Sequence, residues 1–184
     1  PTPEITNWTL NILAKHNAKA TFFCIGKNVK KHPDIFQKII EQGHSIGNHT
    51  HNHLNGWKVN SKIYLENVAI AANEFNSAIE GSRNHKDKLK DKKLFRPPYG
   101  KLKFRQAKKL RRLGYKIIMW DVLSADFDET IPTEKCVEHV IKNTQNGSII
   151  IFHDSLKAEK NLKFALPIVL EHFNRKGFVF KAIS

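Results

Sequence analysis

The feature that most constrains the fold is a repeated switch between two hydrophobic periods along the chain. Short apolar runs of extended character, such as 21–25, 116–120 and 148–152, alternate with longer segments whose apolar residues recur every three or four positions. Strands that alternate with helices of ten or more residues predict βαβ units and a parallel sheet. Because the strand runs are almost wholly apolar, we expect both faces of that sheet to be covered.

The pattern predicts six strands, at 21–25, 45–46, 94–96, 116–120, 148–152 and 178–180. It predicts helices at 3–17, 29–40, 62–79, 103–113, 132–144 and 162–175. A complete eight-stranded barrel typically needs about 250 residues, so 184 residues fit a smaller, incomplete (β/α) barrel better. An open doubly wound sheet is the alternative. No glycine-rich phosphate loop follows a predicted strand, which argues against nucleotide binding.

The chain is strongly basic, with a formal net charge of +14 and a pI near 9.8. Such a field attracts polyanions, including nucleic acid, anionic lipid and acidic cell-envelope polymers. Basic residues concentrate at 86–93 and 101–112, and we expect both runs to be solvated faces. In the second run Phe104, Ala107, Leu110 and Leu113 recur at helical spacing and predict its apolar face. No zinc-finger, RNA-recognition or helix-turn-helix pattern accompanies the charge, so no specific nucleic-acid partner is expected.

Two further sequence features limit the class of protein. No run approaches the roughly 18 apolar residues of a membrane-spanning helix, so no transmembrane segment is expected. Cys24 and Cys136 each lie among apolar neighbours, which predicts two small buried side chains rather than a disulfide or a nucleophile.

Polar side chains of catalytic type follow four of the predicted strands, where functional groups of parallel α/β folds collect. After the strand at 45–46, His49 and His53 are four residues apart, a spacing that lets two imidazoles share one metal ion. We expect His51, between them, to point away. A catalytic zinc ion usually has three protein ligands, so a carboxylate is expected to complete the site. The alternative is a solvated loop that is rich in histidine by chance.

The other strand ends carry groups suited to acid–base chemistry. His153 terminates the strand at 148–152, and Asp126 is expected within reach of it, as for a charge-tuned general acid. Alternatively, His153 only caps the strand. Arg96 precedes two prolines that stiffen the backbone, which would suit it to hold a carboxylate in fixed geometry. An ordinary surface ion pair is the alternative for Arg96.

The ordered set of these motifs resembles the polysaccharide deacetylases, the carbohydrate esterases that share the NodB homology domain. The resemblance covers essentially the whole chain and rests on His49-Thr50-x-x-His53, Arg96-Pro97-Pro98-Tyr99, Asp126-Phe127 and Ile150-x-x-His153. It implies a distorted barrel of about seven parallel strands. It also implies removal of acetyl groups from N-acetylated sugars with a divalent metal, most readily zinc, with cobalt, nickel or manganese as alternatives.

The same resemblance assigns roles to individual residues. His49 and His53 would bind the metal, and Arg96 would orient the catalytic base. Pro98 and Tyr99 would line the substrate groove, with the Tyr99 backbone N–H as an oxyanion donor. Asp126 would tune His153, the donor of a proton to the leaving amine. Phe127 would form an aromatic wall of the groove, and Ile150 would help to enclose the acetyl methyl group.

The implied partner is an N-acetylated polysaccharide or oligosaccharide, either chitin-like or peptidoglycan. The implied compartment is the cell envelope or the exterior, with the cytoplasm as the alternative. The sequence gives no oligomeric state. A carbohydrate-binding pseudoenzyme of the same fold is the first alternative function, and a basic polyanion-binding protein is the second.

The sequence departs from the family pattern at three places. Phe127 replaces the usual tryptophan, Leu123 replaces an aspartate, and the family's first motif, with its paired aspartates, is absent. Those aspartates are the general base and the third metal ligand. Because residues 22–25 are apolar on both faces, we expect a further strand that carries them before Pro1. Residues 1–184 are therefore expected to form a single domain that is N-terminally incomplete and almost inactive by itself.

Overall fold

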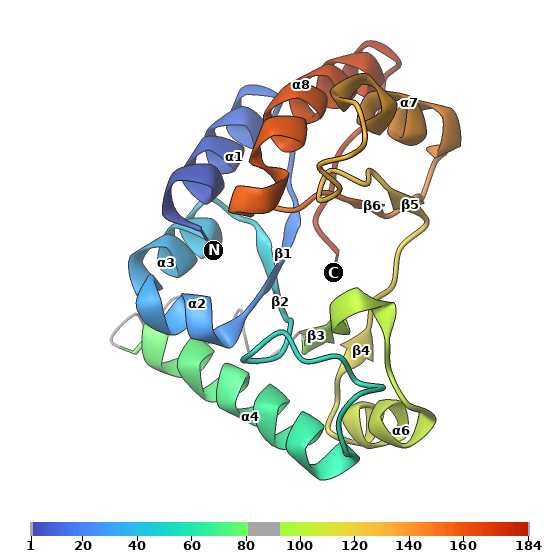
Figure 1. The fold of residues 1–184 in the computed structure, drawn as a ribbon. Helices are drawn as coiled ribbons and strands as arrows, with labels where there is room; N and C mark the ends of the chain where they lie inside the picture. Colours follow the sequence, from blue (N-terminus) through green and yellow to red (C-terminus); the bar gives the residue numbers. More distant parts are fainter. Residues whose placement is uncertain (1, 81–92, 184) are drawn as a thin grey trace. The chain divides into compact units, whose positions relative to one another are not determined.

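The computed structural model describes residues 2–80 and 93–183, which divide into two compact units (Figure 1). The first unit contains Thr21–Met119 and the C-terminal residues from Ala182. The second contains Thr2–Ala20 and Trp120–Lys181. The basic run at 86–93 lies outside the described residues except for Lys93, so its predicted solvation is not addressed by the structure.

The first unit is built on a parallel sheet in the order β1-β2-β3-β4 (Figure 1). Its strands are β1 (Thr21–Cys24), β2 (Ser45–Asn48), β3 (Leu94–Phe95) and β4 (Lys116–Ile117). The register pairs Cys24 with Asn48 and Asn48 with Phe95, so these strands end at one level. The residues that directly follow these strands therefore lie at the same edge of the sheet.

Helices α2 (Gly26–Lys31), α3 (Pro33–Glu41), α4 (Ser61–Ala78) and α6 (Phe104–Arg112) complete the first unit. Helices α2 and α4 lie side by side (Figure 1). Between the sheet and helices α4 and α6, Tyr64, Val68, Phe95 and Leu110 form a buried cluster. The predicted helical stretch at 29–40 is two helices, because Pro33 cannot donate a backbone hydrogen bond and begins a new helix.

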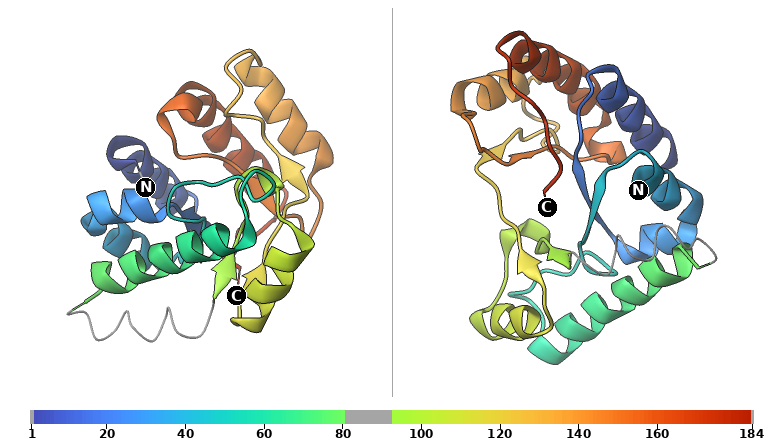
Figure 2. Two further views of the ribbon diagram at one scale, coloured as in Figure 1. Left: turned by 60° about the horizontal axis from the view of Figure 1, so that its bottom comes forward. Right: turned by 180° about the vertical axis from the view of Figure 1, so that it is seen from behind.

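The second unit contains a two-stranded parallel sheet of β5 (Val122–Leu123) and β6 (Ile150–Ile151). Its helices are α1 (Pro3–Lys15), α7 (Thr133–Asn143) and α8 (Glu159–Arg175). Helix α7 lies alongside α8 in both views of Figure 2. The core of this unit is formed by Val122, Val140, Val169 and Phe173.

Three predicted strands and one helix face differ from the structure. The segment 178–180 joins no ladder among the described residues: Phe178 and Phe180 pack on the core while Val179 is exposed. The predicted strands at 116–120 and 148–152 are each paired at two residues only, in β4 and β6. The prediction that 116–120 is a buried strand is wrong, since none of its residues is fully buried. In α6, Gln106 and Leu110 are buried, whereas Phe104 and Leu113 at the helix ends are exposed.

The prediction of a parallel α/β fold is confirmed, and the two sheets are compatible with an incomplete barrel. Strand β5 is an addition that was not predicted, since a pair of apolar residues carries too little pattern to identify a strand. Both cysteines are buried and unbridged, as predicted. Among the described residues, no helix has both the length and the apolar character needed to cross a membrane.

Candidate active site

His49 follows the last residue of β2, and its ring is fixed by the neighbouring strand. Its Nδ1 atom lies 2.7 Å from the carbonyl oxygen of Arg96, which can only accept a hydrogen bond. In the neutral ring, Nδ1 therefore carries the proton and Nε2 carries the lone pair. A contact of this kind, from the second ring nitrogen to a backbone carbonyl, is typical of metal-bound histidine.

His53 is brought close to His49 by a tight turn. The two ring centroids are 4.9 Å apart, with an interplanar angle of 63°. Thr50 and His53 both have left-handed backbone conformations, with φ values of 62° and 55°, which are uncommon for residues other than glycine. The buried Thr50 hydroxyl accepts a hydrogen bond from Leu54 N at 3.1 Å and so stabilises this turn.

Tyr99 contacts His53 from a short 3-10 helix after β3 (Pro98–Gly100). Its hydroxyl lies 3.1 Å from His53 Nδ1, and the two ring centroids are 4.6 Å apart. Tyr99 is also left-handed, with φ 60°, and its side chain is mostly exposed, whereas Pro98 is buried. His51 lies elsewhere: a Cβ atom added to Gly26, the first residue of α2, would approach His51 Nδ1 to 2.8 Å.

Arg96 is buried beneath this group, with 9% of its surface exposed. Its guanidinium donates hydrogen bonds to the carbonyl oxygens of Ile118 at 3.2 Å and Met119 at 2.9 Å. It also lies 4.1 Å from the centroid of the Phe23 ring. Burial lowers the pKa of Arg96 to about 10, which leaves it cationic at neutral pH. The alternative of an ordinary surface ion pair is therefore wrong.

The donor set around His49 and His53 suits a metal but is incomplete in the described part of the chain. Two imidazoles, one with its tautomer fixed by a carbonyl, are the kind of ligand that zinc and similar ions prefer. Across residues 2–80 and 93–183, no group of three His, Cys, Asp or Glu side chains is placed to hold a metal ion. The histidine pair would thus supply two ligands of a site that needs at least one more.

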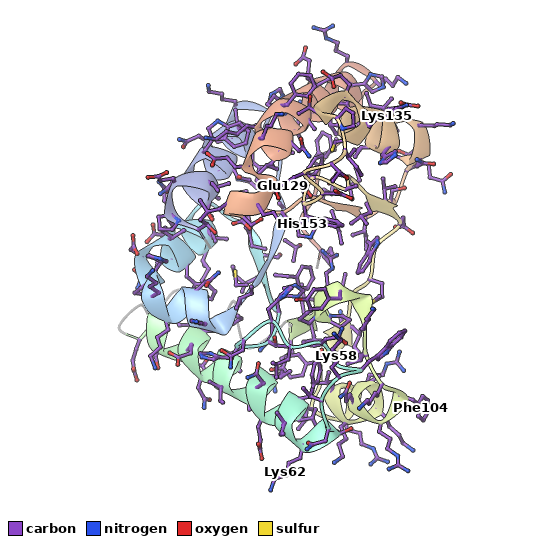
Figure 3. All side chains as sticks on the ribbon, viewed as in Figure 1. Lys58, Lys62, Phe104, Glu129, Lys135 and His153 are labelled. Carbon is purple, nitrogen blue, oxygen red and sulfur yellow. The ribbon has the colours of Figure 1, made fainter. Side chains whose placement is uncertain are left out.

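The second unit contains a separate acid–base pair formed by Asp126 and His153. The Asp126 carboxylate is fully buried and accepts two hydrogen bonds from His153: from Nδ1 at 2.7 Å and from the backbone N–H at 2.6 Å. The His153 side chain is 40% exposed, so its outer part reaches solvent. His153 follows β6, and its side chain is labelled in Figure 3. The arrangement orients an imidazole whose Nε2 could give or take a proton.

Four residues near this pair in the sequence have different contacts. Phe127 stands edge-on to the His153 ring, with the two ring centroids 5.2 Å apart. Ile150 is half-buried and packs on the core of the second unit. Asp154 accepts a hydrogen bond from the Thr6 hydroxyl at 2.6 Å and so anchors α1. Asp121 accepts one from Ile149 N at 2.7 Å.

Three buried asparagines position these groups and were not predicted. Asn67 Oδ1 accepts hydrogen bonds from His51 N at 2.8 Å and Asn52 N at 2.9 Å. Asn48 bridges Val68 O and Thr50 N, each at 2.9 Å. Asn161 donates to the backbone carbonyls of Asp126 and Asp128, both at 3.2 Å. Asn67 and Asn161 interrupt the apolar faces of α4 and α8, which is the sequence feature that could have identified them.

Comparison with known proteins finds related sequences. A family model described as polysaccharide deacetylase matches residues 1–118. A peptidoglycan-N-acetylglucosamine deacetylase of Bacillus cereus is 31% identical over 185 residues, which cover the whole chain and 82% of that protein. Chitin deacetylase 2 of Saccharomyces cerevisiae is 34% identical over 165 residues, which cover 84% of the chain and 47% of that protein.

The fold also matches a solved structure. The crystal structure of the peptidoglycan N-acetylglucosamine deacetylase Bc1960 superposes with a TM-score of 0.88 at 29% sequence identity. The match covers all of this chain and 81% of that one. The chain therefore spans most of some relatives and about half of others.

Proposed function

Because the chain belongs to the polysaccharide deacetylase family, we propose that the protein hydrolyses the acetamide of N-acetylated sugars in a polysaccharide and releases acetate. The observation that carries the proposal is the Asp126–His153 pair, in which a fully buried carboxylate orients a partly exposed imidazole. Amide hydrolysis needs such a group, because the amine leaves only when it receives a proton.

The proton donor in this proposal is Nε2 of His153. Since Nδ1 is hydrogen-bonded to Asp126, a protonated ring carries its second proton on Nε2. As the C–N bond of the acetamide breaks, that proton passes to the nitrogen. The adjacent negative charge of Asp126 stabilises the imidazolium that donates it, and the double hydrogen bond prevents the ring from turning.

The first unit supplies the groups for the carbonyl side of the reaction. His49 and His53 would hold a divalent ion, for which we propose zinc, with cobalt, nickel or manganese as alternatives. When bound, such an ion polarises a carbonyl group and lowers the pKa of a water molecule. The Tyr99 backbone N–H would donate a hydrogen bond to the developing oxyanion. Arg96 would orient the carboxylate that acts as base.

The substrate class follows from the relatives. One is named for peptidoglycan N-acetylglucosamine and another for chitin, and both names describe polymers that carry acetamido groups. We therefore propose an N-acetylated glycan of either type as the substrate. Ile150 and Phe127 would contact its acetyl group and sugar ring.

A second function is favoured by one specific observation. The described residues provide only two histidines of the metal site and no third ligand beside them. If no carboxylate completes the site, the protein would bind the glycan without hydrolysing it, as a pseudoenzyme.

The decisive experiment measures acetate released by the native protein from chitohexaose and from peptidoglycan strands. The protein is first treated with chelator, and zinc is then titrated back. We expect release to return with zinc. His153→Asn should reduce the rate by about 10²–10⁴-fold, the usual contribution of a general acid, with an unchanged melting temperature. His139→Asn on α7 serves as the matched control and should keep the rate. Glycan binding without acetate release at any zinc concentration would support the pseudoenzyme instead.

A further inference from the structure

Trp57 is a large exposed aromatic residue that the proposed mechanism does not use. It lies in the loop between β2 and α4, and 60% of its surface is accessible. A single exposed apolar residue is common on protein surfaces, so exposure alone does not indicate a binding site. The case for Trp57 depends on how its loop is held and on the residues beside it.

The loop that carries Trp57 is held in place by a buried polar side chain. Gln106 on α6 is fully buried; its Nε2 donates to Gly56 O at 2.9 Å, and its Oε1 accepts from Lys103 N at 2.9 Å. The backbone fits so closely that a Cβ atom added to Gly56 would approach Lys101 O to 2.5 Å. The indole is thus presented from an ordered backbone, which lowers the entropic cost of binding a ligand.

Two segments relate Trp57 to the candidate active site: the one that also carries His53, and the one that carries Tyr99 and Lys101. Trp57 is four positions after His53, so their Cα atoms are at most about 14 Å apart. The Lys101 ammonium lies 5.2 Å from the indole centroid, in a cation–π contact. Lys101 comes two residues after Tyr99, whose hydroxyl contacts His53. A polymer bound at His53 could therefore extend over Trp57 within a few sugar units.

The charge of the chain segments around Trp57 and Lys101 indicates which kind of polymer would bind there. Residues 44–65 and 93–119, which supply His49, His53, Arg96 and Tyr99, contain no aspartate or glutamate. Their cationic side chains are Lys58, Lys62, Lys93, Arg96, Lys101, Lys103, Arg105, Lys108, Lys109, Arg111, Arg112 and Lys116. Figure 3 labels Lys58, in the loop before α4, and Lys62, in the first turn of α4. A ligand with negative charges would be attracted to this surface, whereas a neutral one would not.

We propose that Trp57 and Lys101 form a sugar-binding subsite, outside the catalytic residues, that favours acetylated glycans bearing carboxylates. The C–H groups on one face of a pyranose ring would pack on the indole. The Lys101 ammonium would bind a carboxylate carried by the same or the adjacent sugar. That the ligand is a glycan rests on the proposed function. The subsite adds that a glycan with carboxylates is bound more tightly than a neutral, chitin-like one.

The first test measures equilibrium binding of peptidoglycan strands and of chitohexaose to the native protein by calorimetry. Trp57→Ala should weaken binding of both by about tenfold, the size of one aromatic contact, and Trp57→Phe should largely restore it. Phe104→Ala is the matched control, because Phe104 is even more exposed and projects from α6 (Figure 3). A Trp57→Ala protein that binds as tightly as the wild type would overturn the subsite.

The second test isolates the charge preference. Lys101→Gln should lower affinity for the carboxylated strands about three- to fivefold and leave chitohexaose unchanged, whereas Lys62→Gln removes the same charge and should change neither. Equal losses from both variants would overturn a specific role for Lys101. Because affinity and acetate release are separate measurements, a wild-type protein that binds glycan but releases no acetate contradicts only the proposed function. Loss of thermal stability in Trp57→Ala without loss of affinity would mean that the residue is merely structural.

Discussion

At His49, one backbone contact determines which ring nitrogen is suited to bind a metal. The Arg96 carbonyl oxygen accepts the proton on Nδ1, so the ring cannot rotate or change tautomer without losing that hydrogen bond. Arg96 therefore acts twice in the proposed site: its carbonyl fixes His49, while its guanidinium is held by the carbonyls of Ile118 and Met119. These contacts make the first unit rigid at the point where a metal would bind.

Removal of either histidine should therefore lower metal affinity. Replacement of a residue that only hydrogen-bonds to a metal ligand typically weakens metal binding by about 10–100-fold. We expect His49→Ala and His53→Ala in the native protein, which remove ligands themselves, to weaken zinc binding by more than this. Competition with a chromophoric chelator measures this affinity. His32→Ala, at the junction of α2 and α3, is the control and should bind zinc normally. Unchanged affinity in both active-site variants would remove the proposed metal site.

The contact between Asp126 and His153 gives a second testable prediction. Asp126→Asn preserves the shape of the side chain, but its amide can donate to Nδ1 and so favour the wrong imidazole tautomer. We expect kcat for acetate release to fall by about 10²–10⁴-fold with little change in KM. Asp128→Asn removes the same charge from an exposed turn and should stay near wild type. A rate for Asp126→Asn within about threefold of wild type would contradict the assigned role.

The turn that carries the histidines depends on the elements around it. Two backbone N–H groups at the start of α2, from Gly26 and Lys27, donate to Thr50 O at 3.0 Å and His51 O at 3.1 Å. From α4, Asn67 binds the backbone of His51 and Asn52. The left-handed residues of the turn are thus fixed by helices on which no predicted catalytic residue lies.

The closeness of α2 and α4 makes Gly26 sensitive to substitution. A Cβ atom at this position would lie 2.7 Å from Ala71 Cα on α4 and 2.8 Å from His51 Nδ1. We expect Gly26→Ala to lower the free energy of unfolding by about 1–3 kcal/mol, because the helices must separate to admit the methyl group. Urea denaturation measures the change. Lys27→Ala, the next and exposed residue, should change it by less than about 0.5 kcal/mol.

Helices were predicted better from sequence than strands, for a physical reason. A helix satisfies its own hydrogen bonds, so the 3.6-residue period and the terminating Gly114 and Gly177 nearly defined α6 and α8. A strand needs a partner that the local sequence does not contain. The apolar runs at 116–120 and 178–180 therefore predicted extended backbone but not whether a ladder would form.

The candidate site could be predicted only where residue type and spacing carry the chemistry. The His49–His53 spacing and the strand-end position of His153 were sufficient to select those side chains. Asn161 was missed because its role depends on two backbone carbonyl groups distant in sequence, although its interruption of the apolar face of α8 marks the position. The absence of the paired aspartates from residues 1–184, by contrast, could be read directly from the sequence.

At the scale of the whole chain, each unit has its own core and its own share of the proposed chemistry. The candidate metal ligands belong to the first unit, and the Asp126–His153 pair belongs to the second. Within the described residues, β1 pairs with β2 alone, although its Phe22 and Phe23 are only half-buried. An unpaired strand edge of this kind is suited to accept a further strand.

We therefore expect residues 1–184 to form a weak metal site, because the described residues offer two histidines and no third ligand beside them. This polypeptide should bind zinc weakly and release almost no acetate. Zinc titration and an acetate assay measure the two properties, and circular dichroism checks that the protein is folded. Tight zinc binding together with acetate release would show that the 184 residues hold a complete site.

The absence of acidic residues from segments 44–65 and 93–119 has a consequence for the pattern of the reaction along a polymer. Each hydrolysis would turn a neutral acetamide into an amine that protonates to an ammonium group. A surface rich in lysine and arginine repels that product, so a strand would be released sooner as its modified sugars accumulate. Successive reactions would then fall on fresh, still acetylated regions, and free amines would be scattered along the glycan instead of collecting in blocks.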